Sequence, residues 1–508
     1  MNKKKIAFSL IALLSFCISA CGNNQPNESS QESSMTPSSE VTPSSTTPKP
    51  SSSSAIPSSS SSNSSSYSKR SSSSVEPIIV PGDNFTISAP TDLSMMSWNC
   101  KMYVDDMRAQ QQKLIKDKCE NADYYLNDLY GTRGVDITKG IVEGDRGGYR
   151  PANIQNDYLD DVTAKWEDGE KSDENKGVSI SFTPSEELKN KEYTFKYSVN
   201  ADLADAKEIV TNDTEVNLKN LLVNQKYYYQ VSAEGKSSEI LEFTTGDYPR
   251  WINARPMFNV RDHGGYMTSS GQRIKQGLVF RGGEITPATN WKSGSQYTGD
   301  VGGRYTGSNG MMQDGHITSQ SEASKKVFRE DMNMVGGLEI DLRSSSERNG
   351  YSKCGFAENG DISYVLKEIN SYDSPMKDSN KRALIKDVFE AFAKADEHPV
   401  YYHCYGGADR TGTIGFLLGA VLGMSYTDLV IDFELTSYSS NPSRNYRSHL
   451  RAGPYNYWPR MIDYLQGTLG WGSTKTIKQS AEDFLVNDCK IAKSTIETIR
   501  NIMLEPKE

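Results

Sequence analysis

Apolar and polar residues alternate at every second position in the middle of the chain. Five short segments between residues 161 and 248 follow this period, which is typical of strands with one buried face. The segments are Val178–Phe182, Tyr193–Val199, Glu215–Leu218, Tyr227–Val231 and Ile240–Thr244. We therefore expect residues 161–248 to form an all-β sandwich.

The pattern changes after residue 398. Residues 399–402 are typical of a short buried strand, and residues 413–422 are apolar on every side, as expected of a helix enclosed by a larger domain. Gly415, Gly419 and Gly423 fall on one stripe of that helix and are predicted to let it approach the sheet closely. The local order is strand, loop, helix.

The loop between this strand and helix places Cys404 and Arg410 six positions apart. Its backbone N–H groups would point inward at the positive end of the helix dipole, where phosphate binds without a metal. An arginine can grip two phosphate oxygens at once. The candidate phosphate-binding residues are Tyr405, Gly406, Gly407, Ala408, Asp409, Arg410 and Thr411. In this field the pKa of Cys404 should fall well below its usual value of about 8.5, which gives a thiolate nucleophile without a cofactor.

The segment His403–Thr411 is similar to the signature loop of the cysteine-dependent protein tyrosine phosphatase superfamily. Residues 259–266 and 277–281 resemble the opening of its bacterial secreted tyrosine and lipid phosphatase branch, and Ile340–Glu347 resembles a strand motif of that branch. The resemblance implies an α/β catalytic domain over residues 249–508, with a mostly parallel central sheet flanked by helices. It also implies phosphomonoester hydrolysis through a phosphocysteine on Cys404.

Two carboxylates are candidates for the general acid of this reaction. Asp373 lies 31 residues before Cys404 in a stretch with the composition of a loop, and the superfamily carries its acid on a mobile loop at about that distance. Asp409 lies inside the signature loop, and the branch that the chain resembles assigns this role to that aspartate. The sequence leaves both possibilities open.

Three further residues are expected to support the loop. His403 either polarises Cys404 or fills the end of the strand. Asp341 and Arg343 belong to the family-like motif and are expected to form an ion pair that holds the loop rather than to take part in the chemistry.

The N-terminal part of the chain suggests export. Three lysines precede an apolar run from Ile6 to Ile18 that is too short to span a membrane, which predicts a signal peptide over residues 1–20. The following Cys21 completes a tetrapeptide that resembles a bacterial lipobox and is predicted to carry the lipid of an exported lipoprotein on the outer face of the cytoplasmic membrane. Residues 21–83 are rich in Ser, Pro and Thr and are expected to be a disordered stalk.

The composition and charge of the chain limit the classes of partner that it is expected to bind. With 65 acidic and 56 basic residues the formal net charge is −9, which argues against nucleic acid. The cysteines show no metal-binding spacing.

Residues 84–160 are predicted to be partly helical, with an unknown role, and the sequence does not decide whether Cys100 and Cys119 pair. The segment from Leu221 to Val231 resembles the tyrosine corner of fibronectin type III domains, and Trp166 would suit the core of such a domain.

Ala408 bears on the substrate. Lipid-active members of the branch commonly have a lysine before the Asp-Arg pair, and alanine at this position favours a monophosphoester such as phosphotyrosine over polyanionic inositol lipids. Phosphoinositide or inositol phosphate hydrolysis is one alternative. The other is a non-catalytic surface protein that binds phosphorylated ligands or mediates adhesion.

Overall fold

The computed structural model describes residues 77–97, parts of 100–109, 175–285 except Pro256, 304–306, 312–314, 321–348, 352–439, 461, 464–465 and 475–507. The predicted signal peptide, the lipid-bearing Cys21, nearly all of the stalk, Cys119 and Trp166 lie outside these residues. The described residues all belong to one compact unit, residues 74–508.

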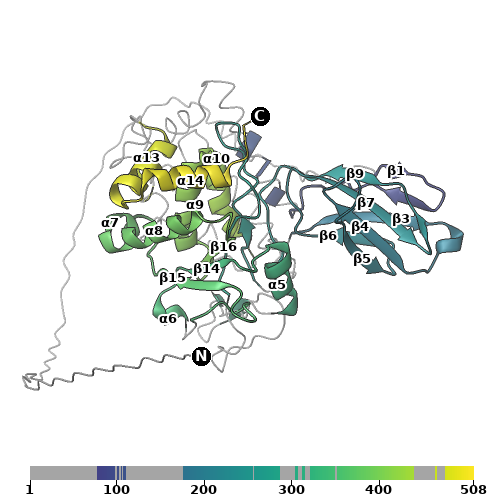
Figure 1. Cartoon of the computed structure of the whole chain (residues 1–508), viewed down its shortest axis with the longest axis horizontal. Coiled ribbons are helices and arrows are strands. Elements are labelled where there is room, and N and C mark those ends of the chain that lie inside the picture. The colour runs from purple at the N-terminus through teal and green to yellow at the C-terminus, as the bar shows by residue number, and fades with distance from the viewer. Residues whose placement is uncertain are drawn as a thin grey trace, which may run out of the picture. The chain divides into compact units, whose positions relative to one another are not determined.

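Two β-sheets share one hydrophobic core in the N-terminal half of this unit (Figure 1). The first has the strand order β1-β2-β3-β6, and the second has the order β5-β4-β7-β8, with β9 also paired to β7. Their bounds are β1 Ile79–Val80, β2 Phe85–Ser88, β3 Val178–Pro184, β4 Tyr193–Ser198, β5 Lys207–Thr211, β6 Glu215–Leu218, β7 Lys226–Ala233, β8 Lys236–Ser237 and β9 Leu241–Thr244.

The sandwich includes strands that the sequence pattern did not predict. All five predicted strands are present. The strand β5 was not predicted, because it is largely exposed at the end of its sheet and its apolar residues Ile209 and Val210 are adjacent rather than alternating. β2 pairs antiparallel with β3, with Phe85 opposite Pro184. Strands β1 and β2 therefore pair with the sandwich, although the sequence placed residues 79–83 in the stalk and residues 84–88 in the partly helical region, because they pair across a long separation in sequence.

The segment that follows β2 belongs to a different core. The described residues of 100–109 are helical, and the apolar side chains of Met96, Cys100, Val104 and Met107 are at most 3% exposed. They lie in the same hydrophobic cluster as the helices of the C-terminal half, and Arg108 forms an ion pair with Asp428 at 3.1 Å. This part of residues 84–160 thus contributes to the core of the C-terminal half.

The C-terminal half is built on a five-stranded sheet of order β10-β11-β16-β14-β15, in which only the β10–β11 pair is antiparallel. This confirms the predicted mixed α/β domain. Its strands are β10 Arg261–Asp262, β11 Val279–Gly282, β14 Leu338–Asp341, β15 Ser363–Leu366 and β16 Val400–His403, and a separate hairpin comprises β12 Arg304–Thr306 and β13 Met312–Asp314.

Helices cover this sheet. α9 packs on β11 and β16 and is itself contacted by α10, α13 and α14 (Figure 1). Phe328 belongs to a second hydrophobic cluster that includes Tyr401, and Val327 packs against it. The helices are α5 Glu322–Lys326, α6 Ser345–Arg348, α7 Asp373–Lys377, α8 Ser379–Phe392, α9 Asp409–Leu422, α10 Tyr426–Glu434, α13 Ile477–Asp483 and α14 Lys493–Met503, with short helical turns at η3 Val327–Asp331, η4 Leu435–Tyr438 and η6 Phe484–Asp488.

The three glycines of the α9 stripe have different neighbours. A Cβ at Gly415 would lie 2.6 Å from a guanidinium nitrogen of Arg281, so this glycine does allow close approach to the sheet. A Cβ at Gly419 would instead meet Met424 and Leu429, and Gly423 ends the helix with φ +96°. The predicted role therefore holds for one position of the three.

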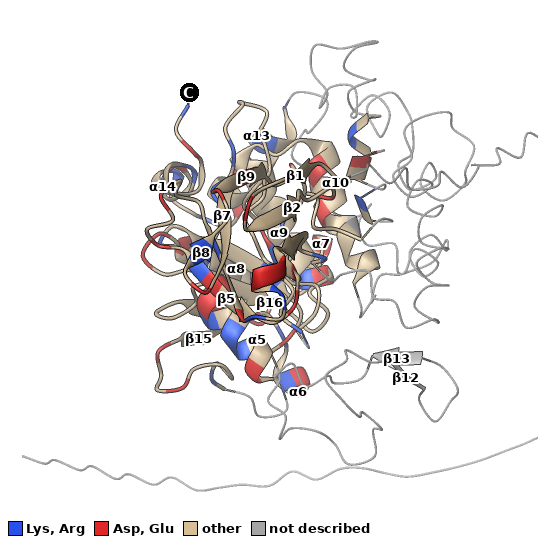
Figure 2. Ribbon diagram, turned by 90° about the vertical axis from the view of Figure 1, so that its right-hand side faces the viewer, with Lys and Arg blue, Asp and Glu red and all other residues tan. Residues whose placement is uncertain are grey.

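Acidic and basic residues are interspersed along β5 and α5 (Figure 2). Among the described residues, the helices are all too short or too polar to cross a membrane.

Candidate active site

The signature loop connects the central strand to the helix behind it. β16 ends at His403 and α9 begins at Asp409, so the five residues from Cys404 to Ala408 span the gap. Gly407 has φ +65°, and a Cβ there would lie 2.4 Å from the carbonyl carbon and oxygen of Gly282 on β11. Only glycine fits this position, because the backbone is left-handed and another backbone lies against it.

Two buried side chains hold the outer side of the loop. Asn259 Nδ2 donates to the carbonyl oxygen of Gly406 at 3.0 Å, and Arg281 Nη2 donates to that of Gly407 at 3.0 Å. In a trans peptide the N–H points away from the carbonyl. Fixing these two carbonyls therefore directs the following N–H groups to the opposite side of the loop.

Asp432 on α10 supplies the negative charge that neutralises the buried arginines beside the loop. It forms ion pairs with Arg261 and Arg281, whose side chains are fully buried. Burial would raise the pKa of Asp432, but the two arginines lower it to about 2. The carboxylate is thus ionised and fixes the arginine that reaches the loop.

Cys404 has the electrostatics of a nucleophile. The residue is 2% exposed, and burial by itself would raise its pKa. The charge of Arg410, with the hydroxyl and backbone N–H of Thr411, outweighs burial and lowers the pKa of the thiol. A lowered pKa increases the fraction of thiolate, which is the reactive form.

Arg410 is oriented by a carboxylate that the site prediction omitted. Its Nη1 and Nη2 donate to the two oxygens of Glu347 at 2.6 and 2.5 Å, a bidentate pair. Although burial raises the pKa of Glu347, hydrogen bonds from Arg410 and Ser344 lower it to about 2. The ion pair restricts the guanidinium to one orientation beside Cys404.

The two candidate acids have different surroundings. Asp373 is the first residue of α7, and its carboxylate pairs with Lys377 at 2.7 Å. Asp409 is the first residue of α9 and accepts a hydrogen bond from the hydroxyl of Tyr372. The stretch expected to be a loop around Asp373 thus enters a helix there, and it reaches the signature loop through Tyr372.

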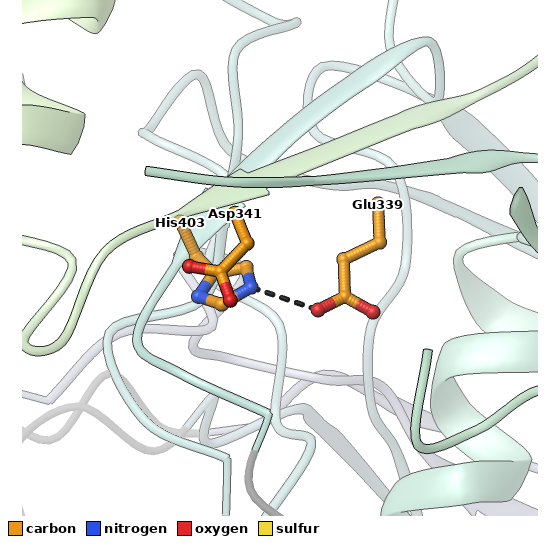
Figure 3. Close-up of side chains that lie close together, drawn as sticks. All are labelled: Glu339, Asp341 and His403. Carbon is orange, nitrogen blue, oxygen red and sulfur yellow. Dashed lines mark hydrogen bonds and ion pairs between the residues drawn. The ribbon is translucent and has the colours of Figure 1, made fainter. Parts of the chain in front are cut away.

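The predicted supporting residues meet behind the loop. Arg343 pairs with Asp341 at 2.7 Å, as expected, and Arg343 Nη1 also donates to Glu284. His403 Nδ1 lies 3.0 Å from the carbonyl oxygen of Cys404 and its Nε2 lies 2.9 Å from Glu339 (Figure 3). His403 therefore contacts the backbone of Cys404, which fits a positioning role.

Glu339, Asp341 and His403 could in principle offer ligands to a metal, because one ligand atom from each lies within 4.8 Å of the others. However, both oxygens of Asp341 already accept hydrogen bonds from Arg343, and His403 Nδ1 must carry a proton to bond the carbonyl. Burial lowers the pKa of His403, but Asp341 and Glu339 raise it above its usual value. The donor set fits a charge-balanced ionic network better than a cation site.

Several residues of this arrangement were not predicted from the sequence. Glu347 ended a recognised motif and Asn259 began another, but neither had a predicted contact with the loop. Asp432 offered a local signal, since it is the acid within the otherwise apolar run from Leu429 to Phe433 in α10. Arg281 ended a further recognised motif, again without a predicted contact, and Tyr372 gave no signal, because a buried aromatic residue is common in a core.

The profile of the tyrosine phosphatase family matches residues 252–302 and 299–505, which together span half of the 508 residues. No curated protein matches the chain.

Proposed function

This chain belongs to the tyrosine phosphatase family and is a phosphoric monoester hydrolase, and we propose that it acts through a phosphocysteine on Cys404, with phosphotyrosine as the favoured substrate. The observation that carries the proposal is the lowered pKa of Cys404 beside Arg410 at the start of α9.

The reaction follows from this geometry in two steps. The Cys404 thiolate attacks phosphorus, and Arg410 with the loop N–H groups stabilises the charge on the phosphoryl oxygens. The P–O bond to the leaving group breaks as a carboxylic acid gives that oxygen a proton. Water then attacks the phosphocysteine, the same carboxylate accepts its proton, and phosphate and thiolate are released.

Hydrolysis of p-nitrophenyl phosphate tests the mechanism. We expect turnover that vanadate inhibits and that a chelator leaves unchanged, and we expect Cys404→Ser to abolish it. Full activity in Cys404→Ser would exclude the phosphocysteine. Tight binding of phosphopeptides without turnover by the wild type would instead favour the non-catalytic alternative.

Ala408 supports phosphotyrosine as the substrate. Its side chain is neutral and 1% exposed, so this position offers no cation to a second phosphate. We expect kcat/KM for a phosphotyrosine peptide to exceed that for phosphoinositides and soluble inositol phosphates. A matched Ala408→Lys variant should shift the ratio toward the inositol substrates, and a wild-type preference for them would contradict the proposal.

We also propose that the domain is displayed at the cell surface. The predicted lipid on Cys21 and the stalk would anchor it, and the sandwich would act as a fibronectin type III-like spacer. Tyr227 supports that likeness because its hydroxyl accepts a hydrogen bond from the N–H of Leu222 at 2.9 Å, as in a tyrosine corner. Cys21→Ala should release the protein from the membrane fraction, and retention there would contradict lipid anchoring.

A further inference from the structure

Tyr372 is attached to the first turn of α9 at two points. Its backbone N–H donates to Thr413 Oγ1 at 2.7 Å, and its hydroxyl donates to Asp409 Oδ1. Thr413 Oγ1 in turn donates to the carbonyl oxygen of Asp409 at 2.8 Å. The backbone and the side chain of one residue are thus both fixed relative to Asp409.

The backbone of Tyr372 is held in a strained conformation. Its φ is 58° and its ψ is −123°, a left-handed region that disfavours residues with a side chain. The side chain is nevertheless 2% exposed, with its ring 6.2 Å from that of Phe433. Strain of this kind persists where the surroundings enforce it, and it is concentrated at functional sites.

Asp409 is also close enough to act on the reacting groups. Its charge raises the pKa of both Cys404 and Arg410. The carboxylate of Asp373, by contrast, is 14% exposed and is engaged by Lys377 on its own helix. The fixed hydroxyl of Tyr372 thus donates a hydrogen bond to the carboxylate whose charge acts on Cys404.

We propose that Tyr372 is a positioning residue that holds Asp409 as the general acid, an inference that rests on the proposed phosphatase mechanism. Because the phenol donates to Oδ1, the acidic proton of Asp409 resides on Oδ2. Oδ2–H protonates the leaving oxygen as the P–O bond breaks. The resulting carboxylate keeps the phenol on Oδ1, and Oδ2 takes the proton of the water that attacks the phosphocysteine.

The test is the dependence of kcat/KM on the leaving group, since kcat/KM reports the steps up to phosphocysteine formation. Phenyl phosphate needs a proton on its leaving group, and 2,4-dinitrophenyl phosphate does not. Tyr372→Phe keeps the buried ring and should lower kcat/KM about tenfold for phenyl phosphate but less than about twofold for the dinitrophenyl ester. Asp409→Asn should show a larger loss with the same selectivity, about 100-fold. Asp373→Asn is the matched control and should change neither substrate by more than about twofold.

A double variant tests whether Tyr372 acts through Asp409. Adding Tyr372→Phe to Asp409→Asn should cause no further loss on phenyl phosphate, because the group it positions is already gone. Equal losses on both esters in Tyr372→Phe, or a leaving-group-selective loss in Asp373→Asn, would overturn the inference while leaving the phosphatase mechanism intact. Failure of the wild type to hydrolyse either ester would overturn the proposed mechanism and this inference together.

Discussion

Replacing Gly407 with alanine should disable the signature loop. A left-handed backbone disfavours alanine by about 1–2 kcal/mol. The added Cβ would also lie 2.4 Å from the backbone of Gly282, which is paired with β16 and cannot move away freely. Overpacking of this kind costs about 1–3 kcal/mol more. We therefore expect Gly407→Ala to lower the free energy of unfolding of the catalytic domain by about 2–5 kcal/mol.

A second glycine separates the two contributions. Gly360 has a similar φ of +73° and is exposed, and a Cβ added there would meet no atom of the described residues within 4 Å. Gly360→Ala should therefore lower the free energy of unfolding by only about 1–2 kcal/mol.

Chemical denaturation measures the loss of stability in both variants. The kcat/KM for p-nitrophenyl phosphate measures whether the active site still functions. Displaced N–H donors should reduce kcat/KM of Gly407→Ala by about 100-fold in protein that is still folded, and Gly360→Ala should keep full activity. Equal stability and equal activity of the two variants would contradict both predictions.

Three further predictions concern charged pairs and the boundary of the domain. Asp432→Asn leaves two buried arginines without their counter-ion and should cost about 3–5 kcal/mol in denaturant unfolding, whereas Asp387→Asn, in a more exposed pair, should cost less than about 1 kcal/mol. Met107→Ala should lower the free energy of unfolding of the catalytic domain by about 2–5 kcal/mol, because Met107 lies in the core of that domain. A loss of stability confined to the unfolding of the sandwich would contradict this shared core. The pKa of Glu347 is lowered in the folded state from 4.5 to about 2, so its contribution is present above pH 4.5 and disappears as the pH falls toward 2. The stability difference between wild type and Glu347→Gln should therefore shrink over that interval, and a constant difference would show that the ion pair is not its source.

Much of the fold could be predicted because its signals are local. The alternation of Tyr227, Tyr229 and Val231 places them on one buried face whatever they pack against, and β7 is present there. The strands at Ile79 and Phe85 lack such a signal. They are short, and β1 pairs only with β2, whose other partner β3 begins 90 residues after the end of β2 (178 − 88), so pairing across that separation depends on the whole sandwich.

The loop that we propose as the reaction centre follows from the sequence alone. The spacing of Cys404 and Arg410 around a glycine-containing loop is a local property, because a strand, a tight turn and a helix N-terminus suffice to create the positive field. The contacts that hold this loop in place follow only from the tertiary structure. Arg281 lies 126 residues from the carbonyl it binds, Glu347 lies 63 residues from Arg410, and Tyr372 lies 37 residues from Asp409. No periodicity links such positions, since the order of strands in the sheet and the helices packed on it bring them together.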